Sequence, residues 1–416
     1  MVLEICLSNF FSIKDEVVLD LRAGNSKSQQ TQRLQANTFA CKDEHLLKSV
    51  AVYGANASGK SNIVKAIQMS VQMILQSHLY NENVVFNIAP FKFEDFPKKP
   101  SFFLIRFVMN DIEYEYSFSF SRNEIFTEEL YYYPNNRRAK VFTRNEKAGK
   151  EKSEIYSFGS AIRKPLDIAE NTSRKTLYIS RASQMDREIA KDVFMFFAEK
   201  IRLGFAFEPL FIEKSFTGNK EVILKALQIA DSDIVNVKME KIKQPHKNVN
   251  ADLANKQILE QNMTIDLLTF TTFHKANKTI PFNFSLEESQ GTQMLFYTIL
   301  NVIDVIKNNK LLLLDEIETS LHSKIVEYII GLFHASDSAQ IVYTTHNTNL
   351  LNLNKLRKDQ IYFVNKKDDG SSDLYSLFDY KDFRDTMDVE KAYLQGRFDA
   401  IPYIDDSLEK IKTIVK

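Results

Sequence analysis

The stretch that decides the fold of this 416-residue chain is Gly54-Ala-Asn-Ala-Ser-Gly-Lys-Ser61. It follows an apolar run that ends at Tyr53 and precedes residues 61–78, whose apolar side chains recur at helical spacing. A glycine-rich turn between a strand and a helix directs successive backbone N–H groups at one anion, and the helix N-terminus adds about half a positive charge. The sequence therefore predicts a phosphate-binding loop of the G-x-x-x-x-G-K-[ST] type.

Each position of this loop has a predicted role. Gly54 and Gly59 permit the tight turns, Lys60 reaches the β- and γ-phosphates, and the Ser61 hydroxyl takes one position around Mg²⁺. The other residues expected to line the nucleotide are Asn56, Ala57, Ser58 and Asn62. The expected ligands are therefore ATP and Mg²⁺.

A second motif, Leu311-Leu-Leu-Leu-Asp-Glu316, is an apolar strand that ends in two carboxylates. A fully apolar run is typical of a central parallel strand, whose carboxyl end belongs at the ligand crevice. Asp315 is expected to hold Mg²⁺, and Glu316 to act as the general base that orients the attacking water. Taken alone, such a run often marks only the end of a strand. Together with the phosphate loop it predicts a nucleotide-hydrolysing site.

The stretch Leu286-Glu-Glu-Ser-Gln-Gly-Thr292 precedes a long periodic helix over residues 292–307, which leads into the acidic strand. Ser289, Gly291 and Thr292 are helix-capping residue types, so a plain capped helix is one interpretation. The functional interpretation is that this helix start binds a second anion, the γ-phosphate of a nucleotide held by another copy of the chain.

A histidine also ends an apolar strand, in Ile341-Val-Tyr-Thr-Thr-His346. A lone histidine at a strand end is usually structural. Here it follows the acidic strand by one helix and one loop, so it is expected beside the same crevice. His346 is therefore a candidate for a hydrogen bond to the γ-phosphate.

Composition excludes several classes of protein. Lysine plus arginine (54) equals aspartate plus glutamate (54), so no global positive field attracts nucleic acid or an anionic membrane. Hydrophobic residues make up 44% and charged residues 26%, which is ordinary globular usage. No apolar run approaches the about 20 residues that span a bilayer, no secretory leader is recognisable, and two cysteines are too few for a disulfide framework. We expect a soluble cytoplasmic protein without a membrane partner.

Four segments are expected along the chain. Residues 1–85 form the N-terminal part of an α/β body with the phosphate loop, and residues 86–158 alternate with period two, as in an antiparallel β subdomain. Residues 159–280 are a helical and irregular insertion, and residues 281–416 alternate helix and strand. This order predicts one α/β sheet built from both ends of the chain, with residues 86–280 inserted between its halves.

Some expectations are more local. The aromatic residues of 86–158 are interpreted as sheet faces, since a base-stacking platform would need interleaved basic residues. Residues 176–180 have a strand-like pattern, and residues 248–261 look like a loop. Strand-like runs at 360–365 and 373–378 precede a short terminal helix.

These motifs together resemble those of the ABC-type ATPases. Residues 54–61, Ser289-Gln-Gly291, Asp315-Glu316 and His346 are similar to the phosphate-loop, signature, acidic and switch-histidine motifs. Within that class the chain resembles the non-transporter branch of RecF, the structural-maintenance-of-chromosomes (SMC) heads and the OLD proteins. More narrowly, it resembles stand-alone bacterial AAA/ABC-like ATPases that are often encoded in abortive-infection and other anti-phage loci. The stretches that carry this narrower resemblance are Asn9-Phe-Phe-Ser-Ile, Pro90-Phe-Lys-Phe, Glu288-Ser-Gln-Gly-Thr, Glu318-Thr-Ser-Leu-His and Tyr393-Leu-Gln-Gly-Arg.

The resemblance implies an ABC-type P-loop head with a mixed sheet flanked by helices, an ATP hydrolase activity, and a homodimer or higher oligomer that closes across the ATP. It implies that residues 318–322 form the loop that crosses to the partner subunit. It also suggests Gln184 as the glutamine that senses Mg²⁺, although a surface glutamine is the plainer interpretation of that residue.

Two features limit what else the chain can carry. Residues 159–280 lack sustained heptads, which excludes a long coiled coil, and the residues after His346 offer too little chain for an appended nuclease domain. We therefore expect a separate effector, a toxin or a nuclease. Alternatives are a RecF-like DNA repair ATPase and a scaffold with negligible turnover. The best local candidate for a DNA contact is the basic stretch Asn135-Asn-Arg-Arg-Ala-Lys140 with nearby Arg144, although a solvated hairpin face is the plainer interpretation.

Overall fold

The computed structural model describes residues 1–25, 28–163, 165–230, 232–252, 257–319, 321–380, 382–384, 387–401 and 413, with the side chains of all but 30, 245–252 and 257–266. The chain divides into two compact units. The first unit comprises Met1–Gly204, Asn308–Glu318 and Ile330–Lys416. The second unit comprises Phe205–Lys307 and Thr319–Ile329. Each unit is described separately below.

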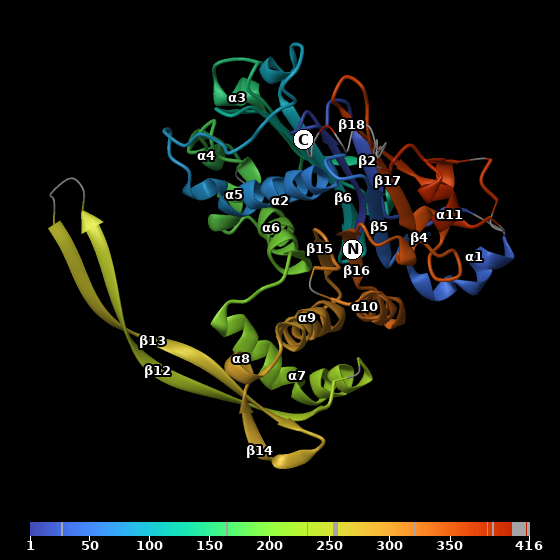
Figure 1. The fold of residues 1–416 in the computed structure, drawn as a ribbon. Helices are drawn as coiled ribbons and strands as arrows, with labels where there is room; N and C mark the ends of the chain where they lie inside the picture. Colours follow the sequence, from blue (N-terminus) through green and yellow to red (C-terminus); the bar gives the residue numbers. More distant parts are fainter. Residues whose placement is uncertain are drawn as a thin grey trace. The chain divides into compact units, whose positions relative to one another are not determined.

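A six-stranded sheet of the first unit carries the phosphate loop (Figure 1). In spatial order its strands are β11 (Ile201–Leu203), β15 (Leu311–Leu314), β16 (Gln340–Thr344), β5 (Ser49–Gly54), β17 (Ile361–Lys366) and β18 (Ser372–Ser376). All neighbours are parallel except β17 and β18, which form an antiparallel hairpin. The expected mixed sheet built from both ends of the chain is confirmed. Strand β11 adds an edge from within the segment that was expected to be an insertion.

A seven-stranded antiparallel sheet forms the other layer of the first unit. In spatial order its strands are β10 (Tyr156–Phe158), β9 (Ala139–Asn145), β8 (Ile125–Tyr132), β7 (Ile112–Phe120), β6 (Ser101–Met109), β1 (Val2–Ser8) and β2 (Val17–Asp20). The N-terminal hairpin therefore extends the antiparallel sheet instead of joining the α/β sheet. Alternate aromatic residues such as Phe103, Tyr116 and Phe118 are fully buried, as the sheet-face interpretation predicts. A short hairpin joins β3 (Thr38–Cys41) to β4 (Glu44–Leu47).

Helix α2 (Lys60–Gln76) connects the two sheets of this unit and packs against β1 and β5 (Figure 1). Its buried residues Ile63, Ile67 and Ile74 belong to one core that includes residues of both sheets. The other α-helices of the unit are α1 (Gln29–Arg33), α3 (Lys152–Ile155), α4 (Pro165–Glu170), α5 (Tyr178–Gln184), α6 (Glu188–Lys200) and α11 (Val389–Leu394). Short 3-10 helices lie at Gln35–Asn37, Ser77–Leu79, Phe96–Lys98, Pro134–Asn136, Thr348–Leu350, Lys358–Gln360 and Leu377–Asp379. Most of the segment after α11 lies outside the described residues, so the terminal helix expected there is not described.

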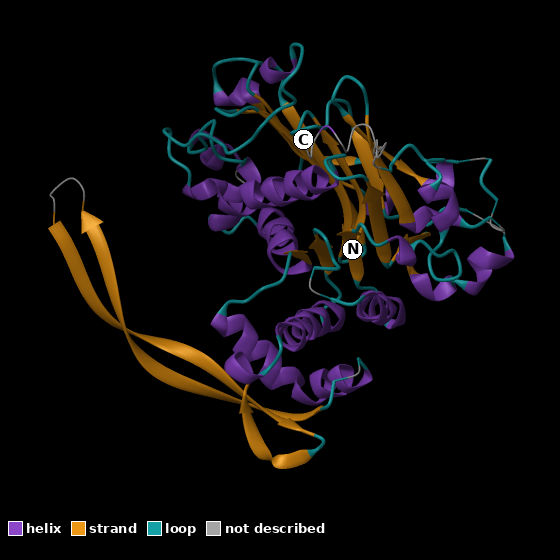
Figure 2. Ribbon diagram, in the orientation of Figure 1, coloured by secondary structure: helices purple, strands orange, loops and turns teal. Residues whose placement is uncertain are grey.

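The second unit combines helices with a long β-ribbon (Figure 2). Its elements are α7 (Pro209–Ile229), β12 (Ile234–Asp252), β13 (Gln257–His274), β14 (Asn277–Asn283), α8 (Phe284–Glu287) and α9 (Gln290–Lys307), while α10 (Ser323–Ala335) begins here and ends in the first unit. Phe216, Phe270 and Phe296 pack ring against ring in its core. The helix expected over residues 292–307 is confirmed as α9.

The loop expected at residues 248–261 is wrong where the chain is described. Strand β12 pairs with β13 continuously from Asn236 opposite Phe273 to Asp252 opposite Gln257. The asparagine-rich sequence has low intrinsic β-propensity, but a paired neighbouring strand supplies the backbone hydrogen bonds regardless of side chain. The two strands are adjacent in the sequence, as in a hairpin, but the backbone hydrogen bonds between them cannot be read from the side-chain pattern of one strand.

The strand expected at residues 176–180 is also wrong, because helix α5 begins there. The Glu128 carboxylate on β8 accepts hydrogen bonds from the backbone N–H groups of Tyr178 (2.6 Å) and Ile179 (3.0 Å). These N–H groups belong to the first turn of a helix, where they lack partners within the helix. A buried carboxylate from a distant strand therefore fixes the helix start and overrides the local alternation of apolar residues.

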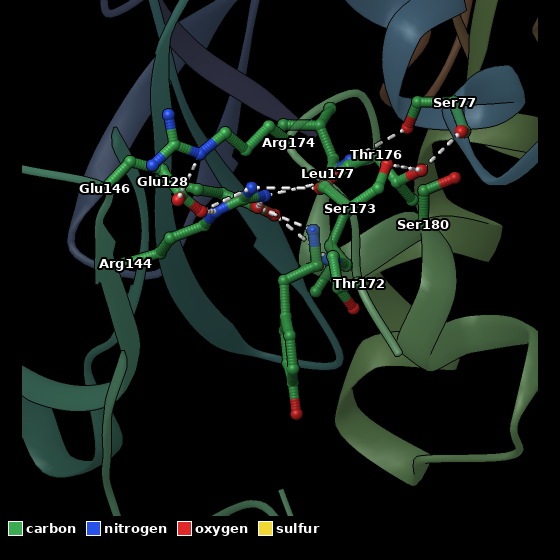
Figure 3. Close-up of polar contacts among 12 residues, drawn as sticks. Ser77, Glu128, Arg144, Glu146, Thr172, Ser173, Arg174, Thr176, Leu177 and Ser180 are labelled. Carbon is green, nitrogen blue, oxygen red and sulfur yellow. Dashed lines mark hydrogen bonds and ion pairs between the residues drawn. The ribbon is translucent and has the colours of Figure 1, made fainter. Parts of the chain in front are cut away.

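Figure 3 shows how a buried polar cluster surrounds this helix start. Arg144 is 1% exposed, pairs with Glu146 at 2.7 Å, and donates to the backbone oxygens of Ser173 and Thr176. The hydroxyl of Thr176 donates in turn to the backbone oxygen of Ser77, just after α2. The cluster thus ties the far end of α2 to the antiparallel sheet. It also removes Arg144 from the basic stretch considered for a DNA contact, because a buried, paired guanidinium cannot reach a polyanion.

Candidate nucleotide-binding site

Three parallel strands bring the predicted site residues to one edge of the six-stranded sheet. Leu314 on β15 lies opposite Tyr343 on β16, and Thr344 lies opposite Val52 on β5. Because these strands run in the same direction, the residues that follow them emerge at the same edge. The phosphate loop, the acidic pair and His346 therefore share one edge within the first unit.

The backbone of the phosphate loop requires glycine at two positions. Gly59 has φ +110°, a left-handed conformation that side chains disfavour. A Cβ atom at Gly54 would lie 2.6 Å from the backbone oxygen of Val364 and 2.7 Å from Ser58 Oγ. Ala57 also has positive φ, +62°. The loop therefore turns tightly on glycine at both ends, as the motif predicts, and Asn56 and Ala57 are exposed between them.

Two serines outside the motif brace this loop. Ser372 Oγ, at the start of β18, donates to the backbone oxygen of Ser58 at 2.5 Å and forms a second hydrogen bond with the Ser12 hydroxyl at 2.7 Å. Asn62 Nδ2 donates to Ser12 Oγ at 2.7 Å. The sequence analysis missed Ser12 and Ser372 as parts of the site. Ser12 lies within the Asn9-Phe-Phe-Ser-Ile stretch, which was a usable signal, whereas Ser372 had none.

The ammonium group of Lys60 is held over the loop. Lys60 Nζ donates to the backbone oxygens of Gly54 at 2.7 Å and Ala55 at 3.0 Å. Burial lowers the pKa of Lys60 to about 8, and the negative charges of Asp315 and Glu316 oppose that shift. A desolvated ammonium bound only to neutral carbonyls gains strongly when phosphate oxygens approach it. The placement fits the predicted role of Lys60.

A chain of hydrogen bonds links the loop to the acidic pair. Ser61 Oγ donates to Asp315 Oδ1 at 3.0 Å, and Thr344 Oγ1 donates to the same oxygen at 2.7 Å. Thr344 Oγ1 in turn accepts the backbone N–H of Glu316 at 2.8 Å. Thr344 therefore connects both carboxylate residues, a role that the sequence analysis did not foresee. It precedes His346 by two residues, so the end of the same strand could have indicated it.

The oxygens at this edge suit Mg²⁺. A serine hydroxyl and one carboxylate lie side by side, and Mg²⁺ is usually held by one or two carboxylates together with substrate phosphates and water. Within the described part of the chain, no group of three or more histidine, cysteine, aspartate or glutamate residues could hold a metal without such help. Ser61 and Asp315 are thus the protein ligands that fit the ion.

Glu316 and His346 are both exposed at this edge. Glu316 follows β15 in a left-handed conformation, φ +52°, which turns the chain sharply after Asp315. Burial lowers the pKa of His346, and the positive charge of Lys60 adds to the effect. The backbone N–H of His346 donates to Glu318 Oε1 at 2.6 Å, so Glu318, expected at the start of a loop that leaves for the partner, also contacts its own chain.

The predicted signature residues lie in the second unit, at the start of α9. Ser289 Oγ accepts the backbone N–H of Thr292 at 3.1 Å, and the backbone oxygen of Ser289 accepts that of Gln293 at 2.9 Å. Ser289 and Gly291 are exposed, and a Cβ at Gly291 would contact no residue except Ser289. The capped-helix interpretation is thus correct as a description of this chain alone. The role of Ser289, Gly291 and Thr292 toward a second copy stays a prediction.

Gln184 is not brought to the phosphate loop. It is exposed at the end of α5, where its side-chain amide donates to Ser183 Oγ. Helix α5 starts beside Ser77, at the end of α2 opposite the loop, and the 17 residues of α2 span about 25 Å. The strand that pairs with β15 at this edge of the sheet is β11, not the strand that was expected just before Gln184. Strand β11 is followed by Gly204, which has φ +93°. Among the described residues, no glutamine follows this strand at the sheet edge.

The fold and the site define a P-loop ATPase domain of the ABC-like type. Residues 49–352 match the family described as "AAA domain, putative AbiEii toxin, Type IV TA system", and the chain belongs to this family. This confirms the resemblance drawn from the sequence motifs.

The solved structures to which the chain is similar include two SMC heads. One is described as the SmcHead bound to the C-winged helix domain of ScpA; it is 17% identical, with a TM-score of 0.41, and the match covers 94% of this chain and 99% of that chain. The other is the SMC head domain from Thermotoga maritima; it is 13% identical, with a TM-score of 0.38 and coverage of 90% and 98%. Both likenesses concern the fold alone. The comparison with curated proteins gives no match. No helix in the described part of the chain is both long and apolar enough to cross a membrane.

Proposed function

We propose that the chain is a Mg²⁺-dependent ATP hydrolase. The observation that supports this most directly is the continuous set of hydrogen bonds from Ser61 through Asp315 and Thr344 to Glu316 at the edge of the phosphate loop. It joins the residues that would bind the phosphates, hold the ion and activate water. Lys60 and the N-terminus of α2 supply positive potential for the triphosphate.

Glu316 is the proposed general base. A water oxygen attacks the γ-phosphorus, the bond to the β,γ-bridging oxygen breaks, and the proton of the water passes to the Glu316 carboxylate. His346, which is exposed at the same edge, donates a hydrogen bond to a γ-phosphate oxygen. Ser61 and Asp315 would hold Mg²⁺, which would supply positive charge to the phosphate oxygens.

ATP is proposed to join two copies of the chain. The exposed start of α9 offers a serine, a glycine and a threonine at a helix N-terminus, which suits the γ-phosphate held by the partner. Symmetric closure of two copies would give two identical composite sites. Because the γ-phosphate would make these contacts, hydrolysis would remove them, and closure becomes a two-state switch. Residues 318–322 are proposed to cross to the partner in this closed state, with the Glu318 carboxylate still accepting the His346 N–H of its own chain; Ser320 lies outside the described residues.

The closed dimer is proposed to control a separate effector, a toxin or a nuclease, in anti-phage defence inside the cytoplasm. The family description names a toxin of a type IV toxin–antitoxin system, which supports a role in such loci.

The test is a single-turnover ATPase assay on the full chain, with and without Mg²⁺, combined with light scattering in ATP. We expect Mg²⁺-dependent release of phosphate and a doubling of mass that ATP induces and hydrolysis reverses. Hydrolysis that duplex DNA stimulates, with steep dependence on salt, would instead favour the RecF-like alternative. ATP binding with no turnover would indicate a scaffold.

A further inference from the structure

We infer that Glu318 is a positioning residue that holds the switch histidine and links it to the segment where the chain leaves the first unit. The inference rests on the proposed hydrolase function and names a further residue that this function needs. It concerns a residue that was expected, from the sequence, only to begin a loop.

The first observation is a direct contact. Glu318 Oε1 accepts the backbone N–H of His346 at 2.6 Å. A hydrogen bond to an ionised carboxylate is about twice as strong as one between neutral groups. This hydrogen bond holds the backbone of His346 and therefore fixes the position of its Cα atom. The ring nitrogens take no part in the bond and stay available to a phosphate.

The second observation is the surroundings of the same carboxylate. Glu318 Oε2 is buried without a hydrogen-bond partner among the described residues, and so are the hydroxyls of Tyr53 and Tyr343. Burial raises the pKa of both tyrosines, and the negative charge of Glu318 adds to the shift in each case. A poorly solvated carboxylate with one satisfied oxygen depends strongly on its bond to His346.

The third observation is the position of Glu318 in the chain. Backbone contacts already join the two strand ends, since the N–H of Glu316 reaches Thr344 Oγ1 and the N–H of Ile317 reaches the oxygen of Thr344 at 3.1 Å. Neither contact extends to the histidine. Glu318 ends the Asn308–Glu318 segment of the first unit, and Thr319 begins the Thr319–Ile329 segment of the second unit. A displacement of residues 319–322 would therefore be transmitted to His346 through the hydrogen bond of the Glu318 side chain.

The consequence concerns when hydrolysis occurs. In the proposed closed dimer, residues 319–322 contact the partner. The movement that brings them there would also fix the position of Glu318, and through its hydrogen bond the position of His346. Hydrolysis would then depend on closure through one hydrogen bond within the same chain.

The experiment is a double-mutant cycle between Glu318→Ala and His346→Ala, measured on the full chain by ATP affinity and single-turnover hydrolysis. We expect Glu318→Ala to lower the hydrolysis rate by about 10- to 100-fold, the effect of one charge-assisted hydrogen bond, with ATP affinity within about twofold of wild type. In the His346→Ala background it should cause no further loss. Glu318→Gln should restore most of the rate, because its amide oxygen can accept the same N–H.

A matched control is Glu390→Ala. Glu390 accepts a hydrogen bond from the Thr348 hydroxyl at 2.8 Å, so it holds the same loop without contacting the histidine. Its loss should leave hydrolysis within about twofold of wild type, since no group at the reacting phosphate depends on it. An equal loss in Glu390→Ala, a full further loss in the His346→Ala background, or a Glu318→Gln variant as slow as Glu318→Ala would each overturn the inference.

Hydrogen exchange separates this outcome from failure of the proposed function. The peptide that contains the His346 amide should exchange faster in Glu318→Ala and at the wild-type rate in Glu318→Gln. If the wild type does not hydrolyse ATP, the proposed function and the role of Glu318 in hydrolysis both fail. Unchanged exchange in Glu318→Ala, beside normal wild-type hydrolysis, would overturn only the contact.

Discussion

The two regions predicted to meet the γ-phosphate differ in how much of their own chain holds them. At the edge of the six-stranded sheet, Lys60, Ser61 and Asp315 are held by hydrogen bonds from three strands and a loop. At the start of α9, Ser289 is exposed, and the hydrogen bonds that it makes among the described residues stay within its own helix turn. The side chains of the first region are held by hydrogen bonds within one chain. The second region leaves the Ser289 hydroxyl and the start of α9 exposed. The difference indicates that substitutions at the first should remove chemistry and those at the second should remove association.

The largest expected effect comes from the acidic pair. Glu316→Gln should slow single-turnover hydrolysis by about 1,000-fold, because a positioned general base contributes about 10²- to 10⁴-fold. ATP binding should persist, and the ATP-bound closed dimer should accumulate. Rapid-quench assays and light scattering would measure both. The exposed Glu199→Gln, on α6, is the control and should behave as wild type. Hydrolysis at the wild-type rate in Glu316→Gln would make the base assignment wrong.

The next effect concerns binding. Lys60→Ala should weaken ATP affinity by about 100-fold, because the buried ammonium can no longer form charge-assisted hydrogen bonds to the phosphates. Isothermal titration calorimetry would measure the change. Lys65→Ala, an exposed lysine on the same helix, should bind ATP normally. If both variants lose affinity equally, the nucleotide is held by the overall positive charge of the helix and not by specific contacts of Lys60.

The third effect would sharpen the comparison most. Ser289→Arg should leave ATP binding by the monomer intact and weaken ATP-dependent dimerisation by at least about tenfold, because a bulky cation at a closed interface must be desolvated. Thr217→Arg, exposed on α7 in the same unit, adds the same charge away from the helix start. Analytical ultracentrifugation with ATP would separate the two. Unimpaired dimerisation of Ser289→Arg would remove the case for a shared site.

The smallest effect is a pH dependence at Lys60. Its pKa is lowered to about 8 in the free protein, and bound phosphates should raise it, so binding takes up a proton above that pH. ATP affinity should therefore fall by at most about tenfold per pH unit between about pH 8 and 9. Lys60→Arg should bind without this dependence, because a guanidinium stays charged throughout. Calorimetry in buffers of different ionisation enthalpy would detect the proton. Affinity that is flat across this range in the wild type would contradict the assignment.

The phosphate loop, the acidic strand and the helix after Ser289 could be predicted because each has a local cause. Glycines that permit a turn, an apolar run and a 3.6-residue period leave their mark within a few residues. Helix α5 and the β12–β13 ribbon could not be predicted in this way. The start of α5 depends on Glu128, which lies 50 residues before the N–H group of Tyr178 that donates to it. Strand β12 forms because β13 pairs with it.

The sequence by itself determined which residues carry charge, which turns need glycine and which strand ends in carboxylates, since these are properties of side chains and of short spacings. Only the tertiary structure decided which of these residues meet. Parallel pairing of β5, β15 and β16 placed Ser61 against Asp315 and joined Glu318 to His346, while it left Gln184 at the far end of α2. Strand order is fixed by contacts between distant parts of the chain, and no local pattern encodes it.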